Sequence, residues 1–142
     1  RPADSPATFA DKVFANAINT AIAQTKDHYE NMMFREALKC GYYDLQSARD
    51  AYRVRCDGDA GMRADLAARF IEVSTLLVVP FVPHTCEHVW GAILGKEGSV
   101  TKAGFPVGDA PDASIAAAGK YLDDLVKTVR GGVAKAGCGS GE

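Results

Sequence analysis

The sequence predicts an all-α protein, an antiparallel helical bundle with a loop-rich C-terminal third. Apolar residues recur every three or four positions through the first 90 residues, which is the period of an amphipathic helix. Eleven of the 14 glycines follow Trp90, so irregular structure is expected to concentrate there. A chain of 142 residues is long enough to bury a core. We expect one domain over residues 1–142, with a helical body at about 8–94 and an extended segment and last helix at about 99–136.

The first helix is predicted to begin at Thr8, a residue type that caps helix N-termini, and to end near Tyr29. Its apolar face includes Phe14, Ile18 and Ile22. We expect Asn31 to cap a second helix over residues 32–55.

The second helix carries apolar or small residues in a 4-3-4-3-4 pattern, which predicts a seam for antiparallel packing. The seam consists of Phe34, Leu38, Gly41, Leu45, Ala48 and Tyr52. At Gly41, the missing side chain is expected to let a neighbouring backbone approach closely.

A third helix is predicted from about Met62 to a break or kink at Pro80. Its second half is apolar nearly all round, which is typical of a buried helix. Pro83 suits the first turn of a fourth helix over residues 84–94. We expect residues 99–106 to be extended, and a last helix to run from Asp112 or Ser114 to about residue 135.

Composition excludes several classes of protein. The chain is 47% hydrophobic, so disorder is not expected, and a net charge of -2 argues against a strongly basic nucleic-acid wrapper. The four cysteines form no CxxC pair, which favours reduced thiols in a cytoplasmic protein. No apolar run is long enough to span a membrane.

The sharpest local motif is HxxEH, formed by His84, Glu87 and His88. Two histidines at i and i+4 on a helix can hold zinc with the glutamate as base, as in inverted zinc proteases. The alternative is an ordinary helix N-terminus, where a glutamate favours the helix dipole. Because no later helix offers a convincing third ligand, we expect no metal site and no catalytic residue. No glycine-rich phosphate loop is present either.

A second pattern is a polar stripe on the second helix, one residue out of phase with the apolar seam. It consists of Arg35, Lys39, Tyr42, Gln46, Arg49 and Arg53. Cations, an amide and an aromatic ring along one line can contact phosphates and stack on bases, so these six residues are the candidate RNA-binding set. Spacing alone also fits a solvated helix face, with Glu36 and Asp50 as intrahelical partners.

Several segments together resemble one family. They are ADKVF at 10–14, YENMMFREALK at 29–39, GYYDLQSARDAYR at 41–53 and RFIEVSTLLVVPFVPHTCEHVW at 69–90. They are similar to the anticodon-binding domain of leucyl-tRNA synthetase. The Pro-x-x-Pro-His-x-x-Glu-x-x-Trp core of the last segment is shared by the leucine, isoleucine, valine and methionine enzymes, whereas NMMFREALK resembles the cytosolic eukaryotic and archaeal leucine type. Residues 99–106 and the last helix fit as well.

The resemblance implies a helical bundle that packs on tRNA, joined to a catalytic domain that activates leucine with ATP and Mg. The family's HIGH-like and KMSKS signatures are not found in these residues, so the chain alone is not expected to catalyse and needs no cofactor. Two alternatives stay open. The domain belongs to a valine, isoleucine or methionine enzyme, or it is a helical protein-interaction module from a multi-synthetase assembly.

Overall fold

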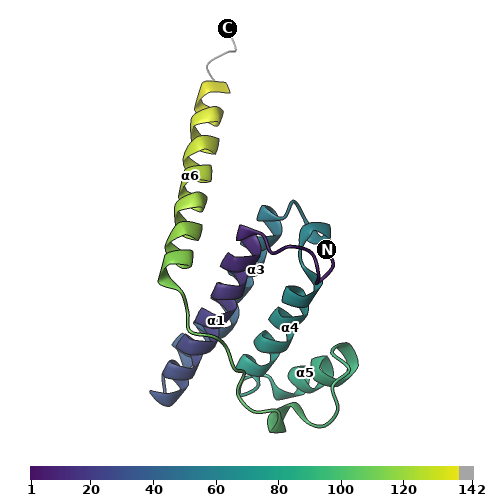
Figure 1. Ribbon diagram of the computed structural model, residues 1–142. Coiled ribbons are helices and arrows are strands. Elements are labelled where there is room, and N and C mark those ends of the chain that lie inside the picture. Colours follow the sequence, from purple (N-terminus) through teal and green to yellow (C-terminus); the bar gives the residue numbers. More distant parts are fainter. Residues whose placement is uncertain (138–142) are drawn as a thin grey trace. The chain divides into compact units, whose positions relative to one another are not determined.

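The computed structural model describes residues 1–137, with side chains to residue 133, and contains helices and no strand over that range (Figure 1). This confirms the predicted all-α class. By its internal contacts the chain divides into a unit of residues 1–111 and a second unit that begins at Asp112. The expectation of one domain over 1–142 remains a prediction, and Cys138 lies outside the described residues.

The first helix, α1, spans Phe9–Glu30 and starts as predicted. The Thr8 hydroxyl accepts a hydrogen bond from the Asp11 backbone N–H, and the Asp11 carboxylate accepts one from the Thr8 N–H, which completes a capping box. Asn31, however, is the C-cap of α1 and not the N-cap of the next helix. The next helix has Met33 in the N-cap position, where no side chain caps it.

The predicted second helix is interrupted. It consists of α2 (Phe34–Leu38), a π-helical segment η1 (Lys39–Asp44) and α3 (Leu45–Arg55). A π-helix closes its hydrogen bonds from i to i+5, so η1 holds one residue more than an α-helix would, which turns α2 by about 100° relative to α3. Ala37 therefore joins Gly41 and Leu45 in the interior, and Phe34, predicted on the seam, is exposed.

Two further helices follow. A 3-10 turn, η2 (Asp59–Gly61), leads to α4 (Ala64–Val78), which is a turn shorter than the predicted third helix. α5 (Pro83–His88) begins with Pro83 in its first turn, as predicted, and continues as a π-helical segment, η3 (Val89–Ile93).

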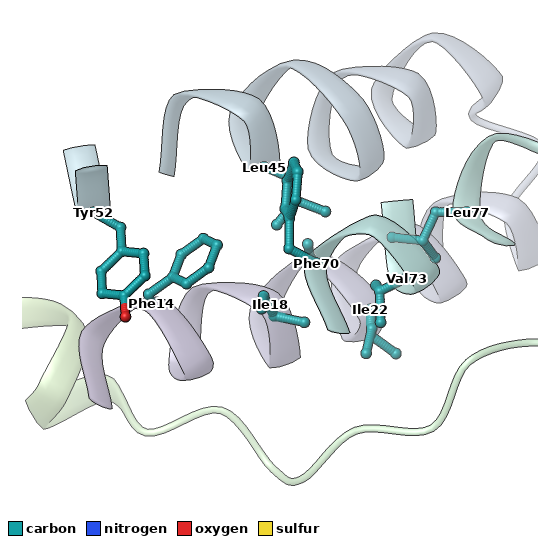
Figure 2. Packing of buried hydrophobic residues seen from close by; sticks show 9 residues of the cluster. Phe14, Ile18, Ile22, Leu45, Tyr52, Phe70, Val73 and Leu77 are labelled. Atoms are coloured by element: carbon teal, nitrogen blue, oxygen red, sulfur yellow. The ribbon is translucent and has the colours of Figure 1, made fainter. Parts of the chain in front are cut away.

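The main core lies between α1, α3 and α4 (Figure 2). Near the start of α1 the Phe14 ring stacks on Tyr52 of α3 at 4.5 Å and meets Phe70 of α4 at 6.0 Å. At its other end the Tyr29 hydroxyl donates to the Leu77 carbonyl at 2.7 Å. α1 is thus antiparallel to α3 and parallel to α4. Helices that follow one another along the chain therefore run in opposite directions, which confirms the predicted antiparallel bundle for residues 1–111.

A buried polar network fixes the C-terminal end of α3. The Tyr52 hydroxyl donates to Asp11 and accepts from the Arg63 backbone N–H at 3.0 Å, while Arg1 pairs with the same carboxylate. Burial raises the pKa of the Asp11 carboxyl, but the hydrogen bonds from Tyr52 and Thr8 and the Arg1 charge outweigh it, and the pKa is lowered overall.

A second cluster joins α4, α5 and the segment after them, through Val78, Cys86, Trp90 and Val100. The segment 99–106 is not extended throughout as predicted, because Val100–Lys102 form a 3-10 turn, η4.

The second unit is described through α6 (Ala113–Gly137). Asp112 begins it: its carboxylate accepts hydrogen bonds from the backbone N–H groups of Ser114 and Ile115 at 2.8 and 3.3 Å. The predicted last helix is confirmed.

Candidate nucleic-acid interface

The six predicted tRNA-binding residues lie on three consecutive helical segments, and none of them is buried. Arg35 is on α2, Lys39 and Tyr42 are on η1, and Gln46, Arg49 and Arg53 are on α3. Because η1 changes the helical phase by about one residue, the three α3 residues share a face, and Arg35 points in a different direction around the axis. The predicted single line is therefore divided into two groups.

Three of the four cations in this set are ion-paired. Lys39 Nζ lies 2.8 Å from Asp44, Arg49 contacts Asp50 at 2.7 Å, and Arg53 Nε lies 2.9 Å from Asp59. All three pairs are on the surface, where a pair contributes about 0–1 kcal/mol to stability. Such weak pairing leaves the cations available to an external anion.

Two arginines of the set, Arg35 and Arg49, differ in how the structure holds their guanidinium groups. Arg35 has no carboxylate partner within residues 1–137. The Arg49 guanidinium sits 5.6 Å from the centroid of the Phe70 ring, so its position is fixed by a cation–π contact with a core residue. Arg49 thus offers an ordered charge and Arg35 an unpaired one.

The hydrogen bond from Lys39 to Asp44 raises the pKa of the Lys39 ammonium, with the Asp44 charge acting in the same direction. Lys39 therefore stays positive throughout the neutral range. Gln46 is half-buried beside these cations.

Tyr43 is a surface residue that the sequence analysis did not select. Its ring is 60% exposed, more than that of Tyr42 at 40%, and the two rings meet edge to face at 5.3 Å. The Tyr-Tyr doublet was visible in the sequence, but in an α-helix only one of two adjacent residues would have faced the predicted stripe.

The three residues of the HxxEH motif, His84, Glu87 and His88, lie on α5. Among residues 1–137 no group of three or more His, Cys, Asp or Glu side chains is placed to hold an ion. Glu87 instead accepts hydrogen bonds from the Ser99 hydroxyl and, at 3.0 Å, from the Val100 N–H, and these two bonds lower the pKa of its carboxyl. Glu87 was predicted to act on its own helix dipole, but it orders the first turn of η4.

Three cysteines are described, and each is a free thiol: Cys40, Cys56 and Cys86. Burial raises the pKa of the Cys40 and Cys86 thiols, so these groups are protonated and poor nucleophiles at neutral pH. No helix among the described residues is long and apolar enough to cross a membrane.

Comparison with known proteins gives a consistent answer. The family described as the anticodon-binding domain of tRNA ligase matches residues 11–136. The cytoplasmic leucine–tRNA ligase of Arabidopsis thaliana is 48% identical over 88% of this chain and 11% of its own length. The cytoplasmic leucine–tRNA ligases of Pongo abelii and Saccharomyces cerevisiae are 44% and 37% identical, over 87% and 90% of the chain. The chain spans about a tenth of the length of these relatives.

Proposed function

We propose that this chain, which belongs to the anticodon-binding domain family of tRNA ligases, binds tRNA through the cations of α2, η1 and α3. The family match over residues 11–136 is the observation that carries the proposal, because it includes all of α2, η1 and α3. The residues that make the contact are Arg35, Lys39, Tyr42, Gln46, Arg49 and Arg53.

The chemistry of this surface supports phosphate contacts. Each surface ion pair holds a cation at a fixed place at little energetic cost, so a phosphate oxygen can replace the carboxylate. A handful of such contacts gives weak binding that falls steeply with salt, with a Kd on the order of 10⁻⁴–10⁻⁶ M at physiological salt for the sequence-independent part.

We further propose that the polypeptide to which this domain belongs is a cytoplasmic leucine–tRNA ligase. The relatives reported above carry that name, and none of them is named for valine, isoleucine or methionine. In such an enzyme a catalytic domain elsewhere in the polypeptide uses ATP and Mg, and this domain holds the tRNA. Membership of a multi-synthetase assembly is a separate proposal for the whole polypeptide, and tRNA binding by this domain does not depend on it.

The binding experiment measures the Kd of leucine-acceptor tRNA for this chain over a range of salt concentrations. Arg35→Gln and Arg53→Gln each remove one cation, and each is expected to weaken binding and to reduce the log–log salt slope by about one unit. Lys26→Gln is the matched control, because Lys26 is an exposed cation on α1 outside residues 34–55. Equal slopes for all three variants and the unmodified chain would remove these two arginines from the proposed surface.

The identity of the parent enzyme is tested by a chimera. This chain replaces the corresponding segment of the Arabidopsis thaliana enzyme, and leucylation of leucine-acceptor tRNA is measured beside leucylation of the valine, isoleucine and methionine acceptor tRNAs. Leucylation that is lost on adding Arg35→Gln and Arg53→Gln together would support both proposals. If the chimera charges normally with both substitutions, tRNA contact by this surface is not needed, and a protein-interaction role is favoured.

A further inference from the structure

The π-helical segment η1 projects two neighbouring tyrosines from the centre of the proposed tRNA surface. On the inner side of η1, Gly41 is packed so closely that a Cβ there would lie 2.9 Å from Thr25 Oγ1 and 3.3 Å from Leu77 Cβ. The helix is thus pressed against α1 and α4 at this point. The additional residue of the π-helix is accommodated on the outer side, where Tyr42 and Tyr43 are exposed.

The rings of Tyr42 and Tyr43 lie outside the two core clusters. The Ser47 hydroxyl donates to the Tyr43 carbonyl at 3.0 Å. Within residues 1–137 the ring of Tyr43 contacts no aromatic ring other than that of Tyr42. Neither ring is needed for the core, which is formed by other residues.

The two rings make a corner. Their planes are 82° apart with centroids 5.3 Å from each other, so one ring offers a face beside the edge of the other. A planar ring that stacks on one tyrosine would also meet the second tyrosine edge to face, which is a favourable aromatic geometry. Lys39, at the start of the same segment, supplies a cation for a phosphate on the sugar that carries such a ring.

We infer that the Tyr42–Tyr43 corner binds an unpaired nucleobase of the RNA. A base inside a duplex is already stacked on both faces, whereas a base in a loop or bulge has a free face for an aromatic side chain. The corner therefore gives the surface a preference for RNA with unpaired bases, in addition to the salt-dependent attraction to phosphates. This inference rests on the proposed function, and it adds Tyr43 to the contacting residues.

Two RNA probes test the corner: a hairpin with a seven-nucleotide loop and a fully paired duplex with the same number of phosphates. The unmodified chain is expected to bind the hairpin more tightly. Replacing both tyrosines by leucine should weaken hairpin binding on the order of tenfold, the effect typical of losing a stacked base, and leave duplex binding unchanged. Because no charge is removed, the salt slope should stay the same.

The matched control replaces both tyrosines by phenylalanine, which keeps the rings and should keep hairpin binding. Circular dichroism of each variant verifies that the helices are intact. Equal weakening of hairpin and duplex, or no weakening of either, would overturn the corner as a base-binding site. If the leucine variant binds the hairpin normally while Arg35→Gln weakens it, the corner fails and the proposed tRNA surface stands. If the unmodified chain binds neither probe but binds leucine-acceptor tRNA, only the corner fails; if it binds none of the three RNAs, both proposals fail.

Discussion

Gly41 is the position where the packing of the π-helical segment can be measured directly. We predict that Gly41→Ala destabilises the protein. The new methyl group would lie 2.9 Å from Thr25 Oγ1, a distance that requires a shift, and Thr25 is fully buried and stiff about its first side-chain torsion. Overpacking of this kind costs about 1–3 kcal/mol, and the higher helix propensity of alanine returns about 1 kcal/mol. The expected net loss is about 0–2 kcal/mol.

The measurement is urea unfolding followed by circular dichroism. Gly91→Ala is the matched control, because Gly91 also lies in a π-helical segment and has no atom within 4 Å of a Cβ position. There the propensity effect acts alone, and a gain of up to about 1 kcal/mol is expected. A stability of Gly41→Ala equal to or above that of Gly91→Ala would refute the reasoning.

The double variant Thr25→Ala, Gly41→Ala identifies the cause. Thr25→Ala removes the two nearest of the three atoms that crowd the new methyl group and leaves Leu77 Cβ at 3.3 Å. It also removes a buried hydroxyl that has no hydrogen-bond partner among residues 1–137. The double variant should therefore recover most of the loss caused by Gly41→Ala, with a coupling energy of about 1 kcal/mol or more. If the two effects simply add, the crowding lies elsewhere.

Three further outcomes are expected. Tyr52→Phe removes the hydroxyl between Asp11 and the Arg63 N–H, so the free energy of unfolding should fall by about 1–3 kcal/mol in urea; no change would mean that water replaces the hydroxyl. The pKa of the Asp11 carboxyl in the folded protein lies below its ordinary value of 3.8. The ionised carboxylate therefore stabilises the folded state above pH 3.8, and this stabilisation is lost as the pH falls through the lower pKa of the folded protein. Thermal melts should show a shallower acid loss for Asp11→Asn, and identical acid profiles would contradict this assignment. Glu87→Gln should speed hydrogen exchange at the Val100 amide and leave α1 unaffected; equal exchange rates would show that the charge is not needed there.

Local sequence signals predicted the parts of the fold that local chemistry determines. Thr8 and Pro83 mark helix starts because a capping hydroxyl and a fixed backbone angle act within one turn. Phe14, Ile18 and Ile22 were found from their spacing alone, and all three are buried. The buried Asp11 was not predicted, because its partners Tyr52 and Arg1 are brought to it only by the tertiary fold.

The errors come from effects that spacing cannot reveal. The seam from Phe34 to Tyr52 fits an α-helical period throughout, and the additional residue of η1 reflects close packing of Gly41 against two other helices. The candidate stripe was divided for the same reason. Segment 99–106 was predicted to be extended because the carboxylate that anchors the start of its 3-10 turn belongs to Glu87, twelve or more residues earlier.

The π-helical segment also restricts which insertions and deletions the helix tolerates. Deleting Tyr43 would let residues 34–55 form a continuous α-helix, but α2 would then turn by about 100° and withdraw Ala37 from the interior. A deletion in an exposed turn of this helix should thus be as harmful as one in the core. A chimera that exchanges helices between related domains should therefore transfer residues 34–55 as one segment. Its two junctions belong in the turns before residue 34 and after residue 55.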